Sequence, residues 1–184
     1  MAKPQTDENA IDVALMKKLA AGDASALETL ISRHQQLVFA LAVRTMRSTE
    51  SAEDIVQDVF VKLYQIADKY QPAAKFTTWL YRIVVNHCLD IMRRQKNKPV
   101  TMDVSTVSQD DRTGDSWLEK TEQAKQIRKV VQALPERQRV VVVLHRFQGL
   151  THKEVSQSTG WSVSAIESLL NRAYKTLRQK LKSV

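Results

Sequence analysis

The chain has 184 residues, of which 43% are hydrophobic, and its formal net charge is +8 at pH 7. This length predicts one or two small domains. No apolar run approaches the roughly 20 residues of a membrane span, and the first residues lack the apolar segment of a secretory signal. Cys88 is the only cysteine, which excludes an internal disulfide and favours a reduced, cytoplasmic setting.

The positive charge is concentrated in the C-terminal third. The net charge is +3 over residues 1–98, −3 over 99–120 and +8 over 121–184. A basic segment of this size is the electrostatic signature of a DNA-binding module. A solvated basic helix face is the alternative that charge alone leaves open.

Helical periodicity runs through nearly the whole chain, which has four glycines and four prolines. This pattern predicts an all-α protein. The first half predicts four helices: about 9–21, ended by Gly22; about 24–48, capped by Asp23; about 50–68, capped by Thr49; and one capped by Thr77 or Thr78 that ends near Lys96.

Residues 99–120 are rich in Ser, Thr and Asp and contain few apolar residues, which predicts a flexible linker. The linker divides the chain into domains at 1–98 and 121–184. The second half predicts helices at about 119–133, 136–146, 152–158 and 163–181. The run Val140–Val143 resembles a strand, but it follows the helix-start pair Pro135-Glu136, so we expect a helix.

The last two helices have the pattern of a helix-turn-helix. Thr151 and Glu154 have capping-box spacing, Thr159-Gly-Trp161 forms a tight turn, and Ser162 can cap the final helix. The alternative is a basic helical hairpin with no DNA role. The side chains that the final helix would offer to bases and phosphates are Ser162, Ser164, Ala165, Glu167, Ser168, Asn171, Arg172 and Lys175.

The predicted helix 50–68 has a polar stripe beside apolar faces. The stripe contains Asp54, Gln57, Asp58 and, one turn on, Val61. Carboxylates repel phosphate, so this side suits a protein partner better than DNA. A solvated helix face is the alternative.

The segment from Phe76 to Arg94 joins an aromatic cluster to paired arginines. Aromatic rings stack on unpaired bases and arginines hold phosphates, so this composition favours single-stranded nucleic acid. Its core face is expected to contain Leu80, Val84, Cys88 and Ile91. The side chains that would meet nucleic acid here are Tyr70, Lys75, Phe76, Trp79, Arg82, Asn86, Arg93 and Arg94. The alternative is that Phe76 and Trp79 are simply core aromatics.

The sequence has none of the patterns that predict an enzyme. It has no Gly-rich phosphate loop, no paired metal-binding histidines and no cysteine cluster. We therefore expect no catalysis, no metal and no cofactor.

Taken together, these motifs resemble the extracytoplasmic-function (ECF) sigma factors of bacterial RNA polymerase. The stretch from Ala52 to Phe60 is similar to that family's polymerase-binding motif. The stretch from Phe76 to Asn86, with Asp90 and Arg93-Arg94, is similar to its −10 segment. Leu134-Pro135-Glu136-Arg137 and the stretch from Gly149 to Glu154 resemble the opening of its C-terminal domain.

The resemblance implies two promoter-reading domains. Residues 1–98 would be sigma region 2, which docks on the β′ clamp helices through Asp54, Gln57, Asp58 and Val61 and melts the −10 element. The loop at 69–76 would hold a flipped base. Residues 121–184 would be sigma region 4, which reads duplex DNA at −35 and contacts the β flap. The family also implies an anti-sigma factor and control of a stress or envelope regulon.

The final helix departs from the family pattern. The family commonly has Lys-Ser-Arg where this chain has Glu167-Ser168-Leu169. Glu167 can accept a hydrogen bond from a cytosine amino group, and the alternative is that it faces away from the DNA. The alternatives to a sigma factor are a helix-turn-helix regulator that acts without polymerase, and a helical protein-interaction module that has lost DNA binding.

Overall fold

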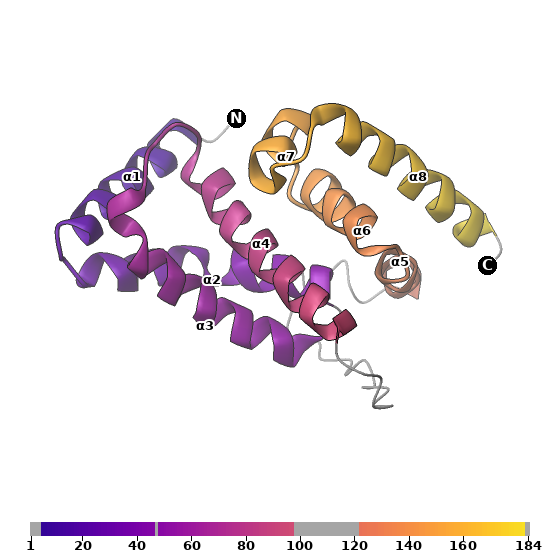
Figure 1. Cartoon of the computed structure of the whole chain (residues 1–184), viewed down its shortest axis with the longest axis horizontal. Coiled ribbons are helices and arrows are strands. Elements are labelled where there is room, and N and C mark those ends of the chain that lie inside the picture. Colours follow the sequence, from indigo (N-terminus) through magenta and orange to yellow (C-terminus); the bar gives the residue numbers. More distant parts are fainter. Residues whose placement is uncertain (1–4, 47, 98–121, 183–184) are drawn as a thin grey trace.

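The structure, a computed structural model, describes residues 5–46, 48–97 and 122–182. Every regular element in these ranges is a helix, which confirms the predicted all-α class. The linker predicted over 99–120 lies outside the described residues. The helices form an N-terminal unit, drawn from indigo to magenta in Figure 1, and a C-terminal unit, drawn from orange to yellow. None of the described helices is long and apolar enough to span a bilayer.

Four long helices and one short 3-10 turn make up the N-terminal unit. They are α1 (Gln5–Ala20), α2 (Ser25–Met46), α3 (Thr49–Gln65), η1 (Ala67–Lys69) and α4 (Phe76–Asn97). Helix α2 packs against α1, α3 and α4. Each apolar side chain that is fully buried between these helices stabilises the fold by about 1.5–3 kcal/mol. Fully or almost fully buried examples at helical spacing are Leu30, Val38, Leu41, Ile55, Val59, Leu63, Leu80, Val84 and Cys88.

The boundary between α1 and α2 follows the local sequence. Gly22 has a φ of +95°, a conformation that side chains with a Cβ rarely adopt, and it follows the end of α1 as predicted. Asp23 Oδ1 then accepts a 3.0 Å hydrogen bond from the backbone N–H of Ser25, the first residue of α2. Hydrogen bonds from Ser25 lower the pKa of Asp23 below its ordinary value.

Two predicted caps were wrong. Helix α3 is capped by Ser48, whose side chain accepts from the backbone N–H of Ser51, and Thr49 is already the first helical residue. Helix α4 begins at Phe76, so neither Thr77 nor Thr78 caps it. The cap of α4 comes instead from a distant helix: Asn9 Oδ1 accepts a 2.7 Å hydrogen bond from the backbone N–H of Phe76.

The C-terminal unit consists of α5 (Glu122–Gln132), α6 (Glu136–Val142), the π-helical turn η3 (Val143–Phe147), α7 (His152–Thr159) and α8 (Val163–Lys182). The run Val140–Val143 is helical, as expected, and every valine in it is at most 2% exposed. A run buried on all sides is as compatible with a core helix as with a strand, and Pro135 at the N-cap of α6 decides in favour of helix.

Helices α7 and α8 form the predicted helix-turn-helix. The capping box is complete, because Thr151 Oγ1 accepts from the N–H of Glu154 and the Glu154 carboxylate accepts from the N–H of Thr151. Gly160 ends α7 in the left-handed conformation, with a φ of 74°. Ser162 Oγ accepts from the N–H of Ala165 at the start of α8, as predicted.

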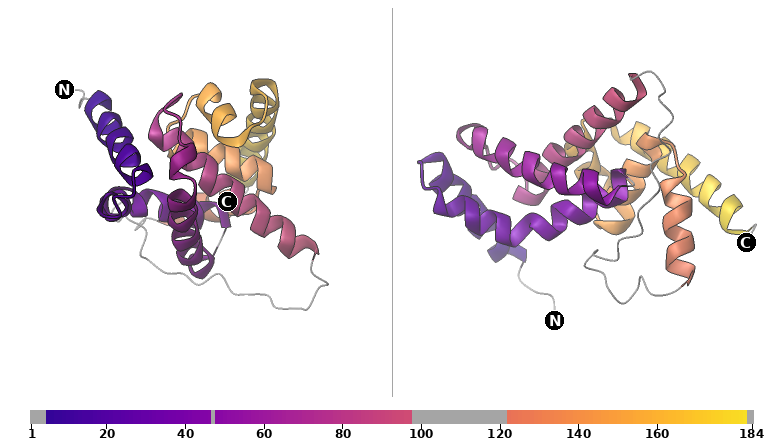
Figure 2. Two further views of the ribbon diagram at one scale, coloured as in Figure 1. Left: turned by 60° about the vertical axis from the view of Figure 1, so that its left-hand side comes forward. Right: turned by 90° about the horizontal axis from the view of Figure 1, so that it is seen from below.

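The two units lie against each other. Helix α4 is packed against its own unit on one side and against α7 of the C-terminal unit on another, as Figures 1 and 2 show. The end of α2 also meets α5, α6 and η3. The structure is therefore a closed arrangement in which both units share a contact surface along α4.

Candidate functional site

The predicted protein-binding stripe is exposed on α3. Asp54, Gln57 and Asp58 are open to solvent, and Val61 is 56% exposed. The opposite side of the helix is buried through Ile55 and other apolar residues. Tyr64, on the next turn after Val61, is also 56% exposed. This surface combines acidic and amide groups with two large apolar side chains that are open to solvent.

A groove joins this stripe to the polar side of α4. Asp58 Oδ2 lies 3.0 Å from His87 Nε2 across the two helices. The groove places the predicted docking residues beside predicted DNA contacts, a proximity that the sequence alone does not reveal. Its lining residues include Asp58, Val61, Lys62, Trp79, Arg82, Asn86, His87 and Asp90.

An aromatic cluster stands between the loop at 70–75 and the core. The ring centroids of Tyr70 and Trp79 are 4.9 Å apart, with the ring planes inclined at 67°, and the centroid of Phe76 lies 6.0 Å from each of them. Phe76 is fully buried and packs on His34, so it is a core residue here, and the prediction that its ring meets nucleic acid is not supported. Tyr70 and Trp79 are half-buried. Burial raises the pKa of Tyr70.

A buried polar group of Asp12, Arg33 and His34 contacts the aromatic cluster through the ring of His34, which packs on Phe76. Asp12 is 2% exposed, accepts a 2.8 Å hydrogen bond from Arg33 Nε and lies 3.0 Å from His34 Nε2. Burial by itself would raise the pKa of Asp12, but the neighbouring His34 and Arg33 outweigh burial and hold the pKa below its ordinary value. Sequence reasoning missed this group, because Asp12 is far from Arg33 and His34 along the chain.

The C-terminal end of α4 presents the paired arginines. Arg93 and Arg94 are exposed, and Arg93 Nη1 donates a 2.8 Å hydrogen bond to Asp90 Oδ1 on the same helix. Lys75, in the loop before α4, and Arg82, on its outer side, are also exposed. These cations give α4 and its preceding loop the charge that phosphate groups require.

The predicted DNA-reading face of α8 is open. Ser162, Ser164, Glu167, Ser168, Asn171, Arg172 and Lys175 are exposed, and Ala165 is half-buried. The opposite face of α8 is buried through Ile166, Leu170 and Ala173. Helix α8 therefore has one face in the core and one polar, basic face free for a ligand.

Two aromatic contacts shape the surroundings of α8. His152 Nδ1 lies 3.6 Å from Glu167 Oε1, and the rings of His145 and His152 are 5.0 Å apart. The guanidinium of Arg137 lies 5.2 Å from the centroid of the Trp161 ring, in cation–π geometry. Trp161 thus links the turn of the helix-turn-helix to α6.

Comparison with known protein families gives one matching family for each unit. The family described as "Sigma-70 region 2" matches residues 30–98, and the family described as "Sigma-70, region 4" matches residues 124–177. The first match contains α3 and α4, and the second contains α6 to most of α8.

Individual relatives match over nearly the full chain. The ECF RNA polymerase sigma-E factor of Escherichia coli strain K12 is 27% identical over 184 residues, which cover 95% of this chain and 96% of that protein. The RNA polymerase sigma-H factor of Pseudomonas aeruginosa is 25% identical over 180 residues, which cover 92% and 93% respectively.

Solved structures agree in fold. The structure of CnrH in complex with the cytosolic domain of CnrY matches with a TM-score of 0.68 and 26% identity, over 94% of this chain and 98% of that one. The sigma factor RpoE of Bartonella quintana, in complex with the anti-sigma factor NepR, shares the fold with a TM-score of 0.63 and 20% identity, over 84% and 96%. The chain therefore belongs to the extracytoplasmic-function sigma factors of the sigma-70 family.

Proposed function

We propose that this sigma factor docks on core RNA polymerase through α3 and reads two promoter elements, one with each unit. Sigma factors are not enzymes, so its work is binding and positioning. The residues at 1–98 would act at −10 and those at 121–184 at −35, joined by a linker at 99–120. The exposed stripe of Asp54, Gln57, Asp58 and Val61 carries the proposal, because a DNA-binding regulator that acts alone has no need of it.

At the −10 element, the loop at 70–75 and the outer side of α4 would hold the melted strand. Tyr70 and Trp79 are half-buried aromatics beside exposed Lys75 and Arg82, which suits stacking on unpaired bases with cations on the phosphates. The Tyr70 hydroxyl is buried without a hydrogen-bond partner among the described residues. We infer that this loop binds a base flipped out of the duplex, and stacking on the exposed parts of Tyr70 and Trp79 would offset the few kcal/mol that unstacking costs.

At the −35 element, α8 would enter the major groove. Ser162, Ser164 and Glu167 near its N-terminal end would face base edges, and Arg172 and Lys175 would hold phosphates. The remaining exposed positions of this face, Ser168 and Asn171, lie between the two groups.

We further propose that an anti-sigma factor regulates this chain and that it works in the cytoplasm, where polymerase transcribes DNA. The support is the likeness to RpoE of Bartonella quintana, solved with the anti-sigma factor NepR. The β flap and the β′ clamp helices are the polymerase surfaces that the family resemblance implies. A regulon for stress or the cell envelope is the corresponding genetic proposal.

In vitro transcription tests the proposal directly. Purified core polymerase would be supplied with this chain and a library of promoters, and the RNA start sites would be sequenced. We expect starts at a fixed distance from two shared sequence elements. Absence of specific starts, with the chain still binding duplex DNA alone, would favour a regulator that acts without polymerase.

A further inference from the structure

Glu167 is an acidic group on the DNA-reading face of α8. It lies in the second turn of the helix, and its side chain is 54% exposed. The residues three and four positions away on α8 are Val163, Ser164, Leu170 and Asn171, so none of its neighbours on the helix surface is a cation. A carboxylate that faces phosphate groups without a partner weakens binding to every DNA sequence. This position therefore requires a partner for the charge, a donor on the DNA, or both.

The partner within the chain is His152, the first residue of α7. Its Nδ1 atom lies 3.6 Å from Glu167 Oε1, within the distance of an ion pair. Among the residues that the structure describes, Glu167 has no other hydrogen bond or ion pair. One contact therefore orients the carboxylate, and its exposed part can still accept a hydrogen bond from a ligand.

The ring of His152 has a fixed neighbour in the ring of His145. The two ring centroids are 5.0 Å apart. Nδ1 of His145 lies 2.7 Å from the backbone oxygen of Leu150, and because a carbonyl oxygen only accepts, this nitrogen carries the hydrogen. His145 is thereby attached to the backbone just before α7, on the side from which His152 begins the helix.

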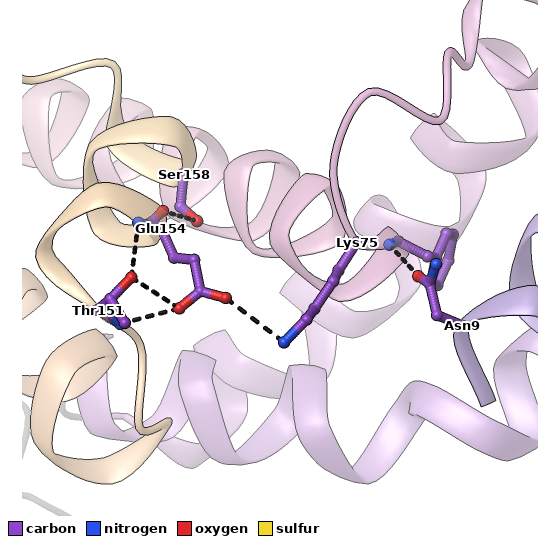
Figure 3. A network of polar contacts seen from close by, with 6 residues as sticks. Asn9, Lys75, Thr151, Glu154 and Ser158 are labelled. Carbon is purple, nitrogen blue, oxygen red and sulfur yellow. Dashed lines mark hydrogen bonds and ion pairs between the residues drawn. The ribbon is translucent and has the colours of Figure 1, made fainter. Parts of the chain in front are cut away.

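The backbone at the start of α7 is fixed by its capping box (Figure 3). Thr151 Oγ1 accepts a 3.2 Å hydrogen bond from the N–H of Glu154, and Glu154 Oε2 accepts a 2.9 Å hydrogen bond from the N–H of Thr151. The other oxygen of Glu154 lies 3.5 Å from Lys75 Nζ. His152 directly follows Thr151, so these bonds also hold the backbone from which the His152 ring reaches Glu167.

The hydroxyl groups at the start of α8 already have partners within the helix. Ser162 Oγ accepts from the N–H of Ala165 and lies 3.2 Å from Ser164 Oγ. The first cation of this face, Arg172, follows Glu167 by five residues, or roughly 7.5 Å along the axis. Glu167 is therefore the strongest acceptor in the N-terminal half of the face, which is the half that meets base edges in a helix-turn-helix.

A carboxylate in this half of the helix favours one base. In the major groove cytosine presents an amino donor, guanine and thymine present acceptors, and adenine presents an amino group beside the N7 acceptor. Acceptors on the DNA repel a carboxylate, so only cytosine gives it a donor without repulsion. We propose that Glu167 reads cytosine at one base pair of the −35 element, and that His152 is a positioning residue that directs the carboxylate toward this base. This inference rests on the proposed function of α8 at −35.

Transcription from a promoter library tests which base Glu167 reads. The complete chain would be combined with core polymerase, and RNA would be counted for promoters in which each base pair of the −35 element is varied in turn. We expect a preference for cytosine of about fivefold or more at one base pair. Glu167→Ala should remove this preference, and Glu167→Gln should shift it toward adenine, because an amide donates to N7 and accepts from the N6 amino group.

Variants of His152 test its positioning role. His152→Ala should reduce the preference for cytosine about two- to fivefold, the size of one exposed ion pair. His152→Asn keeps an N–H donor close to the position of Nδ1 and should retain most of the preference, a rescue that a purely structural role would not give. Gln157→Ala, at another exposed position of α7, is the control and should leave the preference unchanged. If His152→Ala and the wild type have the same preference, His152 does not position Glu167.

The base preference is a ratio between templates measured on one protein sample. A smaller folded fraction lowers the RNA from all templates and leaves this ratio unchanged, so a loss of fold cannot imitate the expected result. Specific starts without a preference for cytosine, or with a preference that persists in Glu167→Ala, would overturn the reading of cytosine while the proposed function stands. Absence of specific starts with core polymerase would instead refute the proposed function, and this inference with it.

Discussion

Asn9 caps a helix that begins 67 positions later: its side-chain oxygen accepts a 2.7 Å hydrogen bond from the backbone N–H of Phe76. The loop at 70–75 and the start of α4 are thereby fixed to α1. This contact joins α1 to the segment proposed to read the −10 element. The aromatic cluster of Tyr70, Phe76 and Trp79 then packs over the same point.

Asn9→Ala should destabilise the N-terminal unit by about 0.5–2 kcal/mol, the usual cost of losing a helix cap. The loss would be measured as a lower free energy of unfolding in urea. Asn9→Asp keeps an acceptor oxygen at the N-terminus of α4, where negative charge is favourable, and should retain most of the stability. Equal losses in both variants would show that the hydrogen bond to Phe76 is not what Asn9 contributes.

Asp54→Ala combined with Gln57→Ala should weaken binding to core polymerase. Both side chains are exposed and make no contribution to the core of their unit, so the fold should be unaffected. Binding would be measured by titrating labelled chain with core enzyme. Asp68→Ala, an exposed acidic position in η1, is the control that changes charge away from the stripe. If the double variant binds as tightly as the control, α3 is not the docking surface.

Gln71→Ala should slow the opening of duplex promoters and spare promoters that are already melted. Gln71 is exposed in the loop at 70–75, and a flipped base that loses a contact there no longer offsets the cost of unstacking. In a pre-melted template the base is already unstacked, so this free energy of unstacking is not required. Open complexes would be counted on both templates by permanganate footprinting. A similar loss on the two templates would contradict a role in base capture.

Arg172→Ala should weaken binding to all −35 sequences alike and reduce the salt dependence by about one phosphate contact. Arg172 is exposed beyond the first turns of α8, where side chains reach the backbone more readily than base edges. The dissociation constant would be measured at several salt concentrations on a panel of −35 duplexes. A changed base preference would assign Arg172 to sequence reading instead.

Sequence periodicity was sufficient to predict which faces of single helices are buried and which are exposed. The helical spacing predicted Leu80, Val84, Cys88 and Ile91 as core positions; the first three are completely buried, and Ile91 is half-buried against the core. The predicted capping box at Thr151 and Glu154 is present. Both features are local, because the residues involved lie within a few turns of one helix. The exposed stripe of α3 and the polar face of α8 follow from the same spacing.

Tertiary contacts account for what the sequence did not predict. Phe76 was expected to meet nucleic acid, but it is fully buried because His34 and the neighbouring aromatics enclose it. The start of α4 depends on Asn9, and Lys75 is paired with Glu154 from the other unit. No local pattern encodes partners so far apart in the chain, so these contacts required the fold.

The buried carboxylate of Asp12 should make stability depend on pH in the acid range. Its pKa in the folded chain lies below the ordinary value of 3.8, so its contribution is fully present above that value and is lost as pH falls through the folded pKa. Asp12→Asn should therefore be less stable than wild type at pH 7, and the difference should narrow below about pH 4. Urea unfolding at a series of pH values would measure it. Asp68→Asn, at an exposed position, is the control and should have the same free energy of unfolding as the wild type at every pH. If the difference in free energy between Asp12→Asn and the wild type stayed constant down to the lowest pH, Arg33 and His34 would not stabilise the charged form of Asp12.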